Sequence, residues 1–550
     1  MALRLSSIPF DRAPTSARSG GARRRRARPA ALAVTLTCLL GAACAGNGSP
    51  PQAVGTVGEP AGGEFDQNHT VHEFFETRPG IGIVAAGGAI WEEGPPCPQP
   101  DTPGAPEPVT IALVAPDVVN LDIVGLGNLV FDPPRYVAAA YLDEIEAHGG
   151  INGYCFELQS HVYGYTDPAG DFARICAELR QQQPLVMLGL GLEWVIVQCA
   201  TLLAQIPTIG FYAQHPRAAF AQAGGLLWVD HGSVEFLLDN MMATAFSTGA
   251  LTGDDRAALL YRAGDDTGSA RVTFDAAARR IGLREATSAA VPVDYSGIPV
   301  LVLEQQFREV GGEIFDPDEA SFERALVAMS PEQAGLLRHI RQHFMAVATA
   351  WQAERVTAVV ASGDWSDVRN LMRAAQLLGW FPKWVINDSH YALLVLTDSP
   401  QEQGLNLVQV SSRRAPGDPT EGRDRGCLTL RNTNSSVEVF THRYHTDAWD
   451  LMASTCDYLD IVFGAVARVD GPLTRESFVA ALAETTYEAS HGGLVRFADG
   501  DPYGSDSFRL LSADPNCVLN DWGCMRPLTG WRAPEGDAAP GAGGGETTDG

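Results

Sequence analysis

The acidic residues Asp265 and Asp266 are the part of this 550-residue chain that most resembles a catalytic carboxylate pair. They are adjacent in a turn bounded by Gly264 and Gly268, so their side chains point apart, and a solvated turn explains them better than acid–base catalysis. The sequence also has no GxSxG nucleophile elbow, no Walker loop and no HExxH motif. We therefore expect a protein that is not an enzyme.

Cysteine chemistry points to an oxidising compartment. An even number of cysteines in an exported chain predicts disulfides, although their pairing does not follow from sequence alone. Cys517 and Cys524 close a short loop and are the best candidate pair, and Cys176 and Cys199 lie on successive predicted crossover helices as a second candidate. No CxxC or His-rich group has zinc-site spacing, so we expect no metal and no cofactor. Eight cysteines follow residue 44: Cys97, Cys155, Cys176, Cys199, Cys427, Cys456, Cys517 and Cys524.

The N-terminus has the pattern of an export signal. Four arginines at 23–26 precede an apolar run, 30–40, which is too short to favour a membrane-spanning helix. Leu40 to Cys44 resembles a bacterial lipobox, with Gly41 where a leucine is usual. We expect cleavage before Cys44, lipidation of Cys44, and an exported protein anchored to a membrane and facing the periplasm or the cell exterior. The alternative is an ordinary secretory cleavage site with an incidental cysteine.

The charge of the chain excludes nucleic acid as a partner. Residues 1–44 hold eight arginines and one acidic residue, so the processed chain would carry 31 basic and 65 acidic residues, a net charge of −34. Binding to phosphate backbones needs the opposite sign. At this length and with 45% hydrophobic residues, the chain has material for at least two cores.

Short apolar runs alternate with helix-like segments between Val109 and Tyr212. Runs rich in Val, Ile and Leu that alternate with helices of about a dozen residues predict β-α units in a parallel sheet buried on both faces. In such sheets, small molecules bind at the loops that follow the carboxyl ends of the strands. The same pattern restarts after His231, and the apolar run 300–303 is a possible further strand there. We expect an α/β protein with two doubly wound parallel-sheet lobes joined by a multi-strand hinge.

The predicted domain organisation follows from these patterns and from the Gly- and Pro-rich ends of the chain. Strand 408–411 and a helix near 445–466 are expected to return to the first lobe, and 290–352 forms either a helical excursion or part of the second lobe. The expected segments are a lipoprotein signal peptide 1–44, a disordered tether 45–108, the first part of lobe 1 at 109–231, lobe 2 at 232–407, the lobe 1 return at 408–490, the hinge and C-terminal part of lobe 2 at 491–530, and a disordered tail 531–550.

Several motifs in order resemble one family. The most specific is the glycine-rich turn Gly149 to Gly153 after a predicted helix. Together the motifs resemble the type I periplasmic binding proteins, with the leucine/isoleucine/valine-binding substrate-binding proteins of ABC transporters as the nearest branch. The other motifs are Ile111 to Pro116, Asp167-Pro168, Val186 to Gly189, Ile206 to Ile209, Leu260-Tyr261, Gly363-Asp364 and Gly379 to Lys383.

This resemblance implies two α/β lobes that close on a ligand and deliver it to a membrane permease. Closure binds because contacts from both lobes exist together only in the closed state. A different function on the same fold is the alternative: a lipoprotein that senses a ligand or acts as a scaffold without delivering a substrate. The long segment 290–352 and the missing pocket hydroxyls keep this alternative open.

In the family that these motifs resemble, the loops after strands three and four bind the carboxylate of the ligand. A carboxylate from the second lobe binds the amino group of the ligand. In this chain Glu193 lies near the position where the family has a serine, and a carboxylate at that position repels a ligand carboxylate. This departure from the family pattern therefore favours a neutral, cationic or aromatic solute over an amino acid. The positions expected to contact ligand are Asp117, Leu190, Gly191, Glu193, Phe211, Tyr212, Ala213, Thr267, Trp365 and Asp388.

Each of these residues also has a structural explanation. Glu193 is suited to cap the following helix, because an acidic side chain is favourable at a helix N-terminus. Asp117 ends a strand, Phe211 suits a core position, and Asp388 suits a solvated loop. Both explanations stay open at this point.

Overall fold

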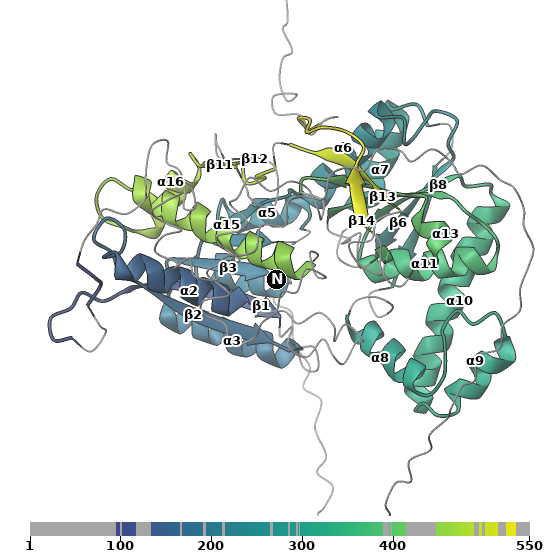
Figure 1. Ribbon diagram of the computed structural model, residues 1–550, viewed down its shortest axis with the longest axis horizontal. Helices are drawn as coiled ribbons and strands as arrows, with labels where there is room; N and C mark the ends of the chain where they lie inside the picture. Colours follow the sequence, from purple (N-terminus) through teal and green to yellow (C-terminus); the bar gives the residue numbers. More distant parts are fainter. Residues whose placement is uncertain are drawn as a thin grey trace, which may run out of the picture. The chain divides into compact units, whose positions relative to one another are not determined.

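The chain forms two large, mainly parallel β-sheets, each covered by helices (Figure 1). The structure is a computed structural model. The structure describes residues 95–98, 102–116, 134–164, 168–190, 194–211, 215–263, 268–283, 286–292, 295, 298–388, 395–396, 399–413, 447–488, 494–497, 501–505, 507–514 and 524–534.

The first sheet has five parallel strands in the order β2-β1-β3-β4-β5. Its strands alternate side chains between two cores, with Ile111 and Leu113 on one face and Ala112 and Val114 on the other. A sheet buried on both faces reads as continuous apolar runs, which is why the sequence predicts these strands well. The strands are β1 (Val109–Pro116), β2 (Phe156–Tyr163), β3 (Val186–Leu190), β4 (Thr208–Phe211) and β5 (Leu227–Val229).

Helices cover both faces of this sheet. One face packs against helices α2, α15 and α16, and the other packs against α3, α4 and α5. Tyr141 of α2 stacks on Phe463 of α15 with ring centroids 5.8 Å apart, so a helix late in the chain returns to the first sheet as predicted. The helices are α2 (Pro134–Ala147), α3 (Pro168–Gln182), α4 (Trp194–Gln198), the π-helical turn η2 (Cys199–Leu203), α5 (Arg217–Ala223), α15 (Asp447–Arg468) and α16 (Arg475–Leu482).

The glycine-rich turn between α2 and β2 is structural. Gly150 has φ +81°, and a Cβ atom there would lie 2.0 Å from the carbonyl oxygen of Tyr154, so only glycine fits. The Asn152 side chain donates to the carbonyl oxygens of Val466 and Ala467, each at 3.2 Å. The turn therefore ties α2 to α15.

The second sheet has seven strands in the order β14-β13-β10-β9-β8-β6-β7. Strands β7, β6, β8, β9 and β10 are parallel, and β13 and β14 are antiparallel at one edge. The sheet consists of β6 (Ala257–Arg262), β7 (Ala286–Val291), β8 (Ala358–Ser362), β9 (Lys383–Asn387), β10 (Leu407–Ser411), β13 (Arg509–Asp514) and β14 (Cys524–Pro527).

Two predictions about this lobe are corrected. Strand β10 pairs with β9, so it belongs to the second sheet and not to the first lobe. Residues 300–303 lie in helix α8 and do not form the possible strand. The prediction was wrong because four consecutive apolar residues do not distinguish a strand from a buried helix.

Helices pack on both faces of the second sheet. Helices α6 and α7 bury one face, and α8 to α11 bury the other. The segment 290–352 is mostly helical, and in Figure 1 α8 and α9 lie at one end of the long helix α10. Phe307 and Phe322 join these helices edge to face at 5.7 Å. The helices are α6 (Val234–Ser247), α7 (Ser269–Arg280), α8 (Ile298–Glu309), α9 (Glu319–Leu326), α10 (Pro331–Ala353), α11 (Trp365–Leu377) and the short α13 (Gln401–Gly404).

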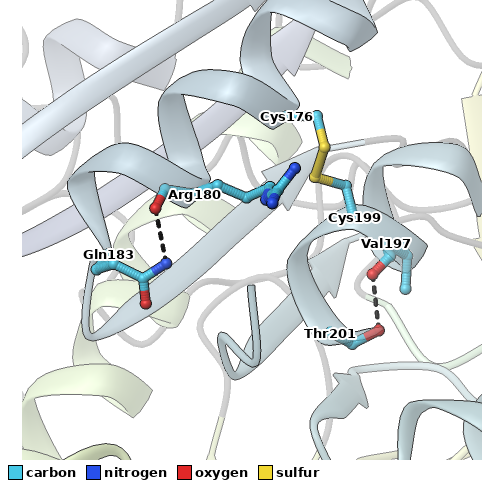
Figure 2. The surroundings of a disulfide bond; sticks show 6 residues. All are labelled: Cys176, Arg180, Gln183, Val197, Cys199 and Thr201. Carbon is cyan, nitrogen blue, oxygen red and sulfur yellow. Dashed lines mark hydrogen bonds between the residues drawn. A yellow bond between two sulfur atoms is a disulfide. The ribbon is translucent and has the colours of Figure 1, made fainter. Parts of the chain in front are cut away.

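Two disulfides lie in the described part of the chain. Cys176 of α3 and Cys199 of η2 are bonded with Cα atoms 5.7 Å apart, as Figure 2 shows, which confirms the predicted pair between successive crossover helices. Cys97 and Cys155 form a second bond that the sequence analysis did not predict. Cys456 is also disulfide-bonded. Cys517 lies outside the described residues, so the proposed pair Cys517–Cys524 stays a prediction.

Parts of the chain predicted to be disordered belong to the fold. Cys97 is bonded to Cys155, and its amide donates to the carbonyl oxygen of Glu146 at 2.8 Å, so this part of the expected tether is fixed to the first lobe. At the other end, Arg532 pairs with Phe508 through two backbone hydrogen bonds of 2.7 Å. Residues 531–534 are therefore part of the fold. Cys44 and the signal segment lie outside the described residues.

Candidate functional site

The carboxyl ends of the first sheet's strands bring two predicted site residues together. Leu190 is the last residue of β3 and Phe211 the last residue of β4, and the two are direct partners in the parallel register. Small molecules bind at such strand ends in open α/β sheets. Asp117, Gly191, Glu193, Tyr212, Ala213 and Thr267 lie outside the described residues, and their ligand contacts stay predictions.

Trp194 and His215 form a ring pair beside these strand ends. Trp194 is the first residue of α4 and comes four positions after Leu190, and His215 comes four positions after Phe211. Their ring centroids are 5.5 Å apart, with 53° between the planes. His215 is buried, and burial lowers its pKa to about 4, so its imidazole is uncharged at neutral pH. The sequence analysis named the loops but not this histidine.

Trp365 follows the carboxyl end of β8 and is the first residue of helix α11. The helix begins with a capping box in which the Asp364 side chain accepts from the Ser366 amide at 2.9 Å. Trp365 is half-buried and packs against the cores of both sheets. The Arg369 guanidinium lies 5.2 Å from its ring centroid. Ligand contact by Trp365 stays a prediction.

Arg369 belongs to a buried ionic cluster around Glu304. The Glu304 carboxylate bonds to Arg308 at 2.9 Å and, at shorter distances, to Arg369 and Arg373. Burial alone raises the pKa of Glu304, but the three arginines outweigh it and lower the pKa to about 2. Glu304 is therefore ionised at neutral pH, and it anchors α8 to α11 beneath Trp365.

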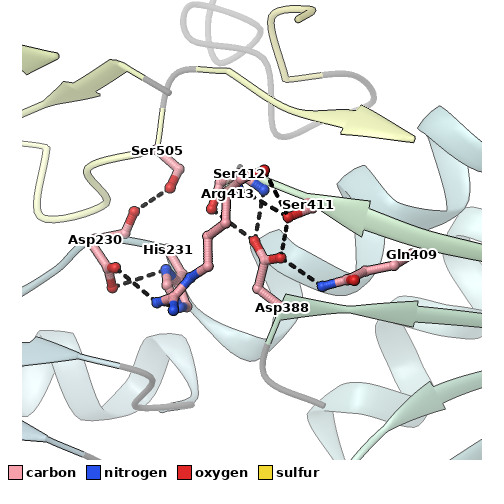
Figure 3. A network of polar contacts seen from close by, with 8 residues as sticks. All are labelled: Asp230, His231, Asp388, Gln409, Ser411, Ser412, Arg413 and Ser505. Atoms are coloured by element: carbon pink, nitrogen blue, oxygen red, sulfur yellow. Dashed lines mark hydrogen bonds and ion pairs between the residues drawn. The ribbon is translucent and has the colours of Figure 1, made fainter. Parts of the chain in front are cut away.

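Asp388, predicted to bind a ligand amino group, is a hydrogen-bond centre at the end of β9. Its carboxylate accepts from Gln409 Nε2 at 2.8 Å, from the Ser412 amide at 2.6 Å, from Ser412 Oγ at 2.8 Å and from Ser411 Oγ (Figure 3). It is 2% exposed, so the interpretation as a solvated loop acid is wrong. These bonds fix the end of β10 against β9, and ligand contact by Asp388 stays a prediction.

The segments that pass between the two sheets meet in a buried polar network, which we call the crossing network. It joins Asp230 and His231 after β5, Arg413 after β10, and Ser505 between the short hairpin β11 (Thr486–Glu488) and β12 (Leu494–Arg496) and strand β13. The sequence predicts a hinge but not these residues, because charged residues in loops are usually exposed to solvent.

Arg413 is the centre of the crossing network. Its Nη2 atom lies 3.2 Å from Asp230 Oδ2 and 2.8 Å from His231 Nε2, and Asp230 Oδ1 lies 2.8 Å from His231 Nδ1. The Ser505 hydroxyl donates to the carbonyl oxygen of Asp230, and Arg509 donates to the carbonyl oxygen of Arg413 at 3.0 Å. Three crossing segments are thus bonded to one another.

The described residues contain neither a metal-site cluster nor a membrane-spanning helix. No group of three or more His, Cys, Asp or Glu side chains there has the arrangement to hold a metal ion. Among the helices in the described ranges, none is both long and apolar enough to cross a membrane.

Comparisons with known proteins find likeness in structure and not in sequence. No family model matches the chain, and no curated protein matches its sequence. A fatty acid ABC transporter substrate-binding protein from Thermomonospora curvata is similar over 81% of this chain and 95% of its own, at 15% identity and a TM-score of 0.52.

Two further solved structures give the same result. A branched chain amino acid ABC transporter from Thermus thermophilus with bound valine matches over 78% of this chain and 97% of its own, at 14% identity and a TM-score of 0.52. An R. palustris solute binding protein in complex with 4-hydroxybenzoate matches over 78% and 98%, at 9% identity and a TM-score of 0.53. This chain has the type I periplasmic binding protein fold, as its sequence motifs predict.

Proposed function

We propose that this chain is an extracytoplasmic solute-binding lipoprotein that captures a small molecule between its two lobes and delivers it to an ABC permease. The main support is the crossing network, in which three segments that link two rigid sheets are bonded side by side. Short linked segments between rigid bodies suit hinge closure, in which ligand contacts from both lobes form only in the closed state.

The fold also favours binding over catalysis. Proteins of similar structure bind small organic molecules, as the valine and 4-hydroxybenzoate complexes demonstrate for those proteins. For this chain we propose that the ligand contacts come from Asp117, Leu190, Gly191, Glu193, Phe211, Tyr212, Ala213, Thr267, Trp365 and Asp388. With Glu193 at the expected carboxylate site, a neutral, cationic or aromatic solute is favoured over an amino-acid zwitterion.

A thermal-shift screen of the purified protein against a metabolite library tests the binding role. A solute present at 100 times its dissociation constant stabilises the protein by about 2.7 kcal/mol. We expect stabilisation by at least one neutral, cationic or aromatic solute. If no solute of any class raises the melting temperature, the binding role is contradicted. Tight binding of leucine would contradict the proposed solute class but not the binding role.

Lipid anchoring is tested separately. We expect wild-type protein to incorporate radiolabelled palmitate and a Cys44→Ser variant to lose the label. Label-free wild-type protein would support the ordinary secretory cleavage site instead.

Ligand sensing without transport is a second candidate function. It is favoured by the helices α8, α9 and α10, which add a large helical group to the second lobe. Uptake of the identified solute should fall when the gene is deleted if the protein feeds a permease. Unchanged uptake together with intact binding would favour sensing.

A further inference from the structure

His215 is a buried histidine at the loop that follows β4. It is 3% exposed, and its carbonyl oxygen accepts from the Val234 amide at 3.0 Å, which fixes the residue beside the beginning of α6. Its Nε2 atom is buried and has no hydrogen-bond partner among the residues that the structure describes. A buried polar atom without a partner costs about 1–3 kcal/mol. Such a cost is expected where function requires the group.

The position of His215 indicates what that function is. Trp194 lies against it with ring centroids 5.5 Å apart, and the two residues follow the loops after β3 and β4. These strands are parallel neighbours whose last residues, Leu190 and Phe211, are paired. The ring pair therefore lies at the carboxyl edge of the first sheet, where a solute would dock. Trp194 is only half-buried, so part of its indole is accessible.

The chemistry of the pair defines the solute that fits. Burial is the cause of the lowered pKa of His215, so the ring is uncharged at neutral pH and does not attract an anion. An uncharged imidazole nitrogen is a donor in one tautomer and an acceptor in the other. A hydroxyl group both donates and accepts, so it satisfies either tautomer. An aromatic ring suits the exposed part of Trp194.

We propose that Nε2 of His215 hydrogen-bonds a hydroxyl group of an uncharged aromatic solute whose ring packs against Trp194. This inference rests on the proposed binding function and narrows its solute class. His215 would then determine specificity, because a solute without the hydroxyl leaves the buried nitrogen unpaired.

Two matched probes test the proposal by calorimetry on the purified protein. They are 4-methylphenol and toluene, which differ only in the phenolic hydroxyl group. We expect wild-type protein to bind the first about tenfold more tightly. Equal affinities, or binding of neither probe, would overturn the proposal without the need for any variant.

Substitutions then assign the preference to His215. In His215→Phe, the preference should vanish, and the melting temperature without ligand should be equal or higher because an unpaired buried nitrogen is removed. His215→Gln keeps a hydrogen-bonding group and should keep part of the preference. A His215→Phe variant that keeps the full tenfold preference would overturn the assignment.

The matched control is His343→Phe. His343 is on α10 in the second lobe, its Nε2 atom also lacks a partner among the described residues, and its ring lies edge to face with Phe344 at 5.3 Å. This variant should keep the wild-type preference, and its loss there would contradict a specific role for His215. If the library screen finds a solute but neither probe binds, this inference fails and the binding function stands. If nothing binds, both fail.

Discussion

Replacement of Arg413 by methionine is the sharpest test of the crossing network. The Arg413 side chain is 5% exposed and that of Asp230 is 4% exposed, so their ion pair is shielded from solvent. Methionine keeps much of the aliphatic volume but removes the guanidinium. It leaves the buried Asp230 carboxylate with only part of its charge compensated, since His231 Nδ1 still lies 2.8 Å from Oδ1, and it also removes the contact to His231 Nε2.

The size of the effect follows from burial. Breaking a buried ion pair by removal of one partner costs about 3–5 kcal/mol, because the remaining charge is left without compensation. We expect Arg413→Met to lower the free energy of unfolding by about 3 kcal/mol. Urea denaturation at pH 7 without ligand measures this. A second substitution, Asp230→Asn, should recover part of the loss because it removes the carboxylate charge that Arg413 compensates in the wild type.

Arg338→Met is the matched control. Arg338 pairs with Glu323 at 2.7 Å, but both side chains are more than 40% exposed, so the urea midpoint should hardly change. The reasoning is refuted if Arg413→Met unfolds at the same urea concentration as wild type, or if the control loses as much stability.

Three further predictions concern buried groups. Glu304 has a pKa lowered to about 2 in the folded protein, so its ion pairs stabilise the fold at any pH above the pKa of the unfolded chain, about 4.5. This contribution of about 3 kcal/mol is lost as the pH falls from about 4.5 to 2. Glu304→Gln should therefore be less stable at pH 7 and show a flatter stability profile in that window, and a parallel profile would contradict this. For His215, with a pKa of about 4, the unfolded chain takes up a proton first, so stability should fall as the pH drops from 6.5 towards 4, and His215→Phe should remove that slope when both are followed by urea denaturation. Removal of the Cys176–Cys199 bond by a double alanine substitution should cost about 3 kcal/mol, since it opens a loop with a sequence separation of 23; an unchanged urea midpoint would contradict this.

The sequence predicts the sheets well because their strands are buried on both faces. Continuous runs such as Ile111 to Ala115 have few alternatives, and the positive φ of Gly150 explains why the turn before β2 is recognisable. The errors arise where local pattern is ambiguous. The apolar run 300–303 fits a strand or a buried helix, and β10 is assigned to its sheet only by its pairing with β9.

The candidate site is harder to predict for a physical reason. Several of its described polar residues are buried and bonded to partners distant in sequence, such as Arg413 with Asp230 and Asp388 with Ser412. Sequence places each of them in a loop, where a charged residue is usually solvated. His215 gives no motif at all, and only its burial and its unpaired Nε2 atom identify it.

The central claim is that two lobes close on a small molecule. Small-angle X-ray scattering of the purified protein, with and without a saturating concentration of the solute found by thermal shift, tests it most directly. Closure about the crossing network predicts a smaller radius of gyration with ligand, and Arg413→Met should change the ligand-free value more than Arg338→Met does. Superimposable scattering curves with and without bound solute would contradict the account.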